Sequence, residues 1–96
     1  MLKSRQQLRE DFNQNGFAFL MTDLDSAMAF AQLALGLNVD PEVKRRNLIN
    51  ARTAYDTVVR LREKLQLDSE QQSAFDEKRT NLKNALEQLG EQISST

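Results

Sequence analysis

Hydrophobic residues recur with a helical period in three stretches of the chain, residues 17–37, 41–66 and 69–89. At about 100° per residue, the apolar positions of residues 17–37 form two neighbouring stripes that cover well over half of the circumference. A helix that is apolar over so wide an arc is buried on two sides, so we expect it to be the central helix. Its apolar positions are Phe17, Phe19, Leu20, Leu24, Ala27, Met28, Phe30, Ala31, Leu33, Leu35 and Leu37.

The other two stretches have narrower apolar faces. If residues 41–66 form a helix, their apolar residues lie on one side and most of their charged residues on the opposite side, which is typical of an amphipathic helix. Residues 69–89 carry a single narrow stripe that includes Phe75, Leu82 and Leu89, and this pattern places the third helix on the outside. No strand pattern, in which β-branched residues alternate with polar ones, is present in the chain.

Local signals mark the ends of these helices. Asp40 reads as an N-cap before Pro41 at the first helical position, and Asp68 as an N-cap with Gln71 at the capping-box position. Gly36 and Asn38 are residues that end a helix in the left-handed conformation, and Gly90 stops the third helix. An alternative start for the first helix is Thr22 as an N-cap, with Asp25 three residues later.

The N-terminal residues 1–15 predict a short helical arm that ends at Asn13–Gly16, with Leu2, Leu8 and Phe12 on one face. A helix this short is marginal in water by itself, so the arm must bury its apolar side chains against something else. We expect Leu8 and Phe12 to be buried against the bundle or a second copy, beside Phe17 or Phe75.

Together these elements predict an all-α fold: one domain of residues 1–96, built as an antiparallel three-helix bundle. The helices lie near residues 17–37, 41–66 and 69–89, the arm covers residues 1–15, and residues 91–96 form a frayed tail.

The composition argues against catalysis. The chain has no histidine and no cysteine, so it lacks the commonest general base, the commonest metal ligand and every thiol nucleophile. Carboxylates one or two residues apart, such as Asp23 and Asp25, point away from each other on a helix. We therefore expect no enzyme activity, no metal and no cofactor.

The net charge of −1 is unevenly distributed. Residues 41–66 carry seven cations and three anions, while residues 17–40 carry three anions and no cation. The basic run Lys44–Arg46 is either a solvated first turn or a contact for phosphate or an acidic partner. A nucleic-acid-contacting regulator is the weakest function considered, because domains that bind nucleic acid are normally far more basic; it would use Arg45, Arg46, Arg52 and Arg60.

The longest apolar run is residues 17–21, which is too short for a signal peptide or a membrane span. We therefore expect a cytoplasmic protein without a membrane partner or a small-molecule substrate.

Three further residues are candidates for contact with a partner. Ile49 is a single apolar residue on the polar arc of its helix, between Arg45 and Arg52. Arg52 lies four residues before Asp56 and is positioned to pair with it. Tyr55 lies on the apolar arc, where it is either a core residue with its hydroxyl at the bundle edge or part of a partner-binding groove.

Residues 50–56, followed by Val58 and Val59 and later by Leu82 and Leu86, resemble a pattern in small bacterial helical proteins. The hairpin of residues 17–66 is similar to the helix pairs of tetratricopeptide-type and MIT-type domains, which bind peptides or helices in a groove. The resemblance implies a protein–protein interaction or adaptor module and assigns no individual binding residue. The alternative is a structural protein that self-associates as a homodimer.

Overall fold

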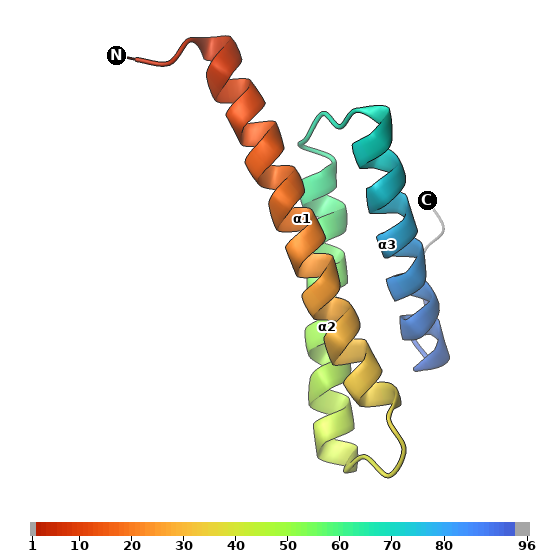
Figure 1. The fold of residues 1–96 in the computed structure, drawn as a ribbon. Coiled ribbons are helices and arrows are strands. Elements are labelled where there is room, and N and C mark those ends of the chain that lie inside the picture. Colours follow the sequence, from red (N-terminus) through yellow and green to blue (C-terminus); the bar gives the residue numbers. More distant parts are fainter. Residues whose placement is uncertain (1, 94–96) are drawn as a thin grey trace.

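In the computed structural model, which describes residues 2–93, the chain forms three helices: α1 (Arg5–Leu35), α2 (Pro41–Arg62) and α3 (Ser69–Gln88). The described residues contain no strand. Successive helices run in opposite directions and are joined by a short loop at each end of the bundle (Figure 1). The predicted all-α three-helix fold is confirmed.

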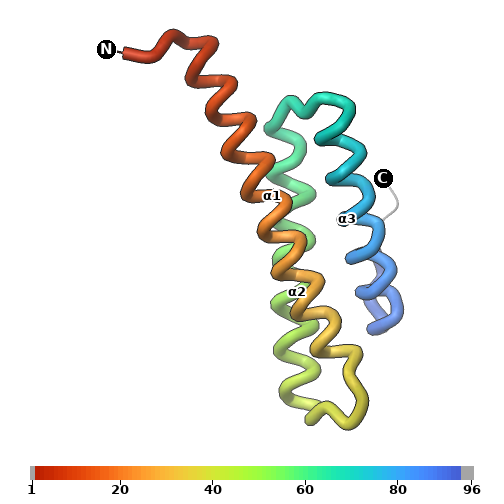
Figure 2. Tube along the Cα trace, viewed as in Figure 1, coloured from red at the N-terminus to blue at the C-terminus, as the bar shows by residue number. Residues whose placement is uncertain are grey.

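Helix α1 is longer than the sequence pattern predicts. It begins at Arg5 with Ser4 as its N-cap, and the predicted arm is the first part of this same helix. Ser4 and Gln7 form a reciprocal capping box, in which each side chain accepts a hydrogen bond from the other residue's backbone N–H. The separate arm and the Thr22 start were therefore wrong, and residues 5–15 project beyond the other helices, as Figure 2 shows.

Two contacts explain why α1 continues through Asn13–Gly16. The Asn13 side chain accepts a hydrogen bond of 3.0 Å from the backbone N–H of Gln66. Gly16 lies against Leu65, so closely that a Cβ at Gly16 would meet Leu65 Cδ2 at 2.6 Å. The polar, glycine-containing segment is thus the place where α1 crosses the α2–α3 loop, and the absence of a side chain at Gly16 allows the close approach.

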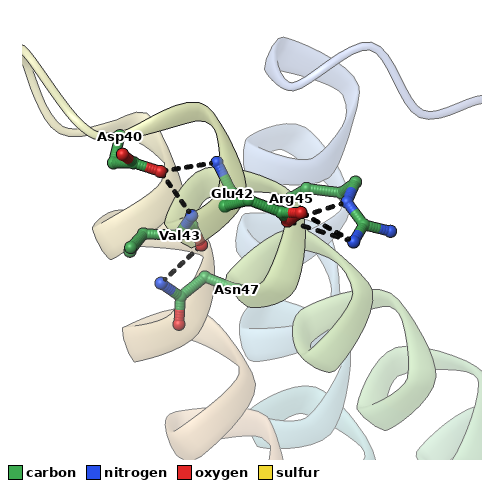
Figure 3. Close-up of polar contacts among 5 residues, drawn as sticks. All are labelled: Asp40, Glu42, Val43, Arg45 and Asn47. Atoms are coloured by element: carbon green, nitrogen blue, oxygen red, sulfur yellow. Dashed lines mark hydrogen bonds and ion pairs between the residues drawn. The ribbon is translucent and has the colours of Figure 1, made fainter.

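The loop ends follow the predicted caps closely. Asp40 accepts hydrogen bonds from the backbone N–H groups of Glu42 and Val43, at 2.8 and 3.4 Å (Figure 3). Asn38 has a positive φ of 59°, whereas Gly36 is extended, so of these two residues Asn38 takes the left-handed conformation. Helix α1 therefore ends at Leu35, two residues before the predicted end.

Helix α2 ends at Arg62, before the predicted residue 66. The Arg62 guanidinium explains the ordered loop that follows, because it donates hydrogen bonds to the Leu65 carbonyl at 2.9 Å and to the Gln72 side chain at 2.8 Å. Asp68 then caps α3 through the predicted capping box with Gln71. The end of α2 is thereby tied to the start of α3.

A Schellman motif closes α3. The N–H of Glu91 bonds the Leu86 carbonyl and the N–H of Gly90 bonds the Glu87 carbonyl, both at 3.0 Å. Gly90 has the positive φ of 94° that this motif requires. The predicted stop at Gly90 is confirmed.

The core lies between α1 and the other two helices. Helix α1 contacts both neighbours, and its contacts with each exceed those between α2 and α3, so it is the central helix, as predicted. Three alanines of α1 are fully buried and let the neighbouring backbones approach. The buried apolar residues of the bundle are Leu20, Leu24, Ala27, Ala31, Ala34, Ala51, Tyr55, Val58, Leu65, Phe75, Leu82, Ala85 and Leu86.

Candidate interaction surface

The N-terminal half of α1, which includes the projecting residues 5–15, carries large apolar side chains in contact with solvent. Leu8 is 56% exposed, Phe12 53% and Phe19 48%. The prediction that Leu8 and Phe12 are buried within this chain was wrong: α1 extends past the ends of α2 and α3 (Figure 1), and neither of these helices covers the two side chains. We call Leu8, Phe12 and Phe19 the apolar row of α1.

The apolar row belongs to one side of the helix. At about 100° per residue the three side chains lie within an arc of about 40°, whose centre is about 100° from the buried Leu20 and about 140° from the buried Leu24. Removing large apolar side chains from water is favourable, and within this chain the three side chains stay about half exposed. Apolar side chains gathered in this way are typical of interaction surfaces, whereas single exposed ones are not.

The row continues towards the body of the bundle as an open, shallow groove between α1 and α2. Phe19 and Phe30 of α1 form one wall and Ala54 of α2 forms part of the other. The remaining lining residues are polar: Asp23, Asn50, Thr53 and Thr57. Beyond the groove, Leu33 on α1 is 58% exposed. The outer face of α1 is therefore apolar at intervals along most of its length, with polar residues between.

The basic end of α2 is built differently. Glu42 in the first turn forms an exposed ion pair with Arg45, with nitrogen and oxygen 3.0 Å apart (Figure 3). Asn47 donates a hydrogen bond of 3.0 Å to the Val43 carbonyl in the same turn. An exposed pair of this kind contributes little to stability, on the order of 0–1 kcal/mol. Arg45 is thus partly neutralised within its own helix.

Ile49 is 49% exposed, as its position on the polar arc predicts. It lines a shallow depression at this end of α2 together with Glu42, Arg45, Arg46 and Asn50. The depression is open to solvent and contains one apolar side chain. It offers a partner much less apolar area than the row on α1.

Arg52 has a structural role that the sequence did not reveal. It forms the predicted ion pair with Asp56 at 3.1 Å. It also pairs with Glu91 at 3.5 Å and donates a hydrogen bond of 3.1 Å to the Gln92 carbonyl. Ile93 packs against the core next to this contact. Residues 91–93 are therefore held in place, and the predicted fraying is wrong for them; residues 94–96 lie outside the described part of the chain.

Tyr55 is only 5% exposed and is part of the core cluster. Burial raises the pKa of its hydroxyl above the ordinary value, because the charged phenolate loses solvation, while the nearby Arg79 and Arg52 act in the opposite direction. The alternative of a core tyrosine is confirmed. Tyr55 is not available on a surface that a partner contacts.

The acidic residues of the described chain do not converge. Asp25 pairs with Lys78 of α3 at 2.5 Å, whereas Asp23 lines the groove on the α2 side of the same helix. Within residues 2–93, no three side chains of the acidic, histidine or cysteine types lie close enough to hold a metal ion. The ion pairs among the described residues lie within α2 or join neighbouring segments of the fold, and Asp25–Lys78 joins α1 to α3.

Among the described residues, α1 is the one helix that is long and apolar enough to cross a membrane by length and composition. Only part of the apolar stretch is buried in the bundle. Asp23 and Asp25 lie within it, and a charged residue near the centre of a bilayer costs about 2.5–3.5 kcal/mol on insertion scales. The cytoplasmic location stays a prediction.

The chain was compared with protein-family models, with curated proteins and with solved structures, and none of the three comparisons finds a match.

Proposed function

We propose that this protein is a non-catalytic interaction module that binds a helix of a partner protein along the apolar row of α1. The observation that carries the proposal is the half-exposure of Leu8, Phe12 and Phe19 on a helix that is longer than the bundle it stabilises. The helix pairs of tetratricopeptide-type and MIT-type domains, which residues 17–66 resemble, point to the same class of function.

The shape of the surface favours a helical partner. The row is straight, follows one helix and leads into the open groove between α1 and α2. An amphipathic helix that presents apolar residues three, four and seven positions apart fits such a surface, because its side chains repeat with the same spacing. A partner helix at this position would add a fourth helix beside α1, as in a four-helix bundle.

The other functions have weaker support. Of the four arginines that a nucleic-acid contact would use, Arg45 pairs with Glu42, and Arg52 pairs with Asp56 and Glu91, so half of the set is already neutralised. A catalytic role has less support because the sequence contains no histidine and no cysteine. Both considerations favour an interaction module.

The test is site-specific photocrosslinking in cells that express the protein. A benzoylphenylalanine at Phe12 or at Phe19 should crosslink to another polypeptide chain, whereas the same group at Gln14, an exposed polar position of α1 outside the row, should not. Circular dichroism of each purified variant checks that α1 is still formed. The absence of any product from Phe12 and Phe19, or equal products from Gln14, would contradict the proposal.

A further inference from the structure

Two charged residues lie on the same side of α1 as the apolar row. At about 100° per residue, Arg5 and Asp23 fall within about 60° of Leu8, Phe12 and Phe19. None of the ion pairs among residues 2–93 uses either of them. The row is therefore bounded by an unpaired cation near the N-terminus of α1 and an unpaired anion in its middle.

This distribution of charge is complementary to itself when the helix is reversed. Residues 1–16 carry three cations and two anions, and residues 17–40 carry three anions and no cation. Two copies of α1 that run in opposite directions bring the basic end of each against the acidic part of the other. A parallel pair would instead set Arg5 against Arg5 and Asp23 against Asp23, and like charges in contact oppose association.

The apolar residues and the charges agree on a single register. If Leu8 of one copy is level with Phe19 of the other, Arg5 lies three residues before Leu8 and Asp23 four residues after Phe19. The two charges are then level to within one residue, about 1.5 Å along the axis. Phe12 of both copies lies beside the twofold axis in this arrangement, so the largest exposed side chain of the projecting segment is at the centre of the contact.

We propose that the partner helix is α1 of a second copy of this chain, paired antiparallel along the apolar row, with Arg5 of each copy facing Asp23 of the other. This inference rests on the proposed function and names its partner. Such a contact is isologous: one patch serves both protomers and the assembly closes as a dimer.

The size of the contact sets the strength of the dimer. Residues 5–23 span about 28 Å of helix, which places the interface at the small end of specific protein–protein contacts. Helices α2 and α3 lie away from residues 5–15 (Figure 2), and Phe19, at the other end of the contact beside the open groove, is about half exposed, so a second copy can reach the whole row. We expect a reversible dimer with a Kd on the order of micromolar.

The experiment is analytical ultracentrifugation of the full chain, from about 1 μM to about 1 mM, a range that covers weak association. Wild type should change from monomer to dimer across it. Arg5→Asp and Asp23→Arg should each raise the Kd by about tenfold or more, because each homodimer then contains two like-charge contacts. Arg46→Asp, with the same change in charge on the exposed start of α2, should leave the Kd within about twofold.

An equimolar mixture of the Arg5→Asp and Asp23→Arg variants provides the decisive measurement. In the mixed dimer both contacts join opposite charges, so the mixture should recover most of the wild-type affinity. The rescue requires contact between two chains in this register, and helicity measured by circular dichroism excludes misfolding. A mixture as weak as either variant alone would overturn the antiparallel pairing.

Failure of this inference is distinguishable from failure of the proposed function. A wild-type chain that stays monomeric throughout the concentration range overturns the dimer. If photocrosslinking at Phe12 then captures a different protein, the interaction module stands and only its partner changes. Binding of the monomer to vesicles of phosphatidylcholine and phosphatidylserine, without any crosslinked protein, would overturn both inferences and assign the row to a membrane surface.

Discussion

The two faces of α1 carry apolar side chains of similar size in opposite surroundings. Leu20 and Leu24 face α2 and α3 and are almost completely buried, whereas Phe19 and Leu33 on the outer face are about half exposed. Both faces satisfy the helical period equally well. The comparison shows that periodicity reports which residues share a face, while burial depends on how many elements are present to cover it.

The difference between the faces is largest for the removal of a buried side chain. Leu24→Ala should lower the free energy of unfolding by about 2–5 kcal/mol, since it leaves a cavity in the core. The same substitution on the outer face, Leu33→Ala, should change it by about 0.5 kcal/mol or less. Urea denaturation at micromolar protein concentration measures both values. Equal losses would mean that the outer face is covered in solution.

At Gly16, a residue in close contact with the core is adjacent in sequence to a residue on the exposed side of α1. Gly16→Val should destabilise the protein by about 1–3 kcal/mol, because the new side chain overlaps the buried Leu65. Asn15→Val, one residue earlier and exposed, should stay within about 0.5 kcal/mol of wild type. Thermal unfolding followed by circular dichroism gives both. A Gly16→Val variant as stable as wild type would show that Leu65 moves freely.

Substitution of N-cap residues compares the projecting end of α1 with the body of the bundle. Asp68→Ala should cost about 1 kcal/mol of global stability, because α3 packs one face into the core. Ser4→Ala removes an equivalent capping box but should act mainly by fraying the first turns of α1, with little effect on global unfolding. Amide hydrogen exchange of residues 5–12 and denaturant unfolding distinguish the two effects. A global loss from Ser4→Ala as large as that from Asp68→Ala would show that the projecting segment is part of the cooperative unit.

The smallest effect concerns the buried side and is confined to high pH. Burial raises the pKa of Tyr55, so the folded state binds this proton more tightly than the unfolded state, whose tyrosine pKa is near 10. The contribution of the protonated hydroxyl is complete below pH 10 and is lost as the pH rises through the higher folded value. Tyr55→Phe should lose less stability than wild type above pH 10.

Tyrosinate absorbance follows this group alone, since the chain has one tyrosine and no tryptophan. A transition at the pKa of free tyrosine in the folded protein would contradict the expectation.

The structural features predicted correctly from the sequence are those that short-range interactions determine. The caps at Asp40 and Asp68 and the stop at Gly90 depend on residues within a few positions, and all three are confirmed. The continuation of α1 through Asn13–Gly16 was missed, because it depends on contacts with Leu65 and Gln66, which are far away in sequence.

The candidate surface could be predicted only in part. The sequence placed Leu8 and Phe12 on one face and required them to be buried, but a single chain does not reveal whether its own helices reach them. Phe19 was assigned to the core because its stripe is apolar, and it is exposed because α2 and α3 leave this side of α1 uncovered. Arg52 is not free for a partner because it contacts Glu91 and Gln92, about forty positions later in the sequence.

The central position of α1 also bears on the order in which the chain folds. Helices α1 and α2 meet after closing the short loop 36–40. The loop between α2 and α3 is also short, but these two helices contact each other little, and α3 packs mainly on α1, as in the pair Asp25–Lys78, 53 positions apart. Closing the longer loop costs roughly 2 kcal/mol more in chain entropy.

We therefore expect the α1–α2 hairpin to form in the transition state and α3 to dock last. In stopped-flow experiments, Val58→Ala should then mainly slow folding, and Leu82→Ala should mainly accelerate unfolding. The reverse pattern would place α3 in the nucleus. If the expected order holds, α3 is the helix whose brief departure exposes the buried side of α1, and the lifetime of the native fold is set by how firmly α3 is held.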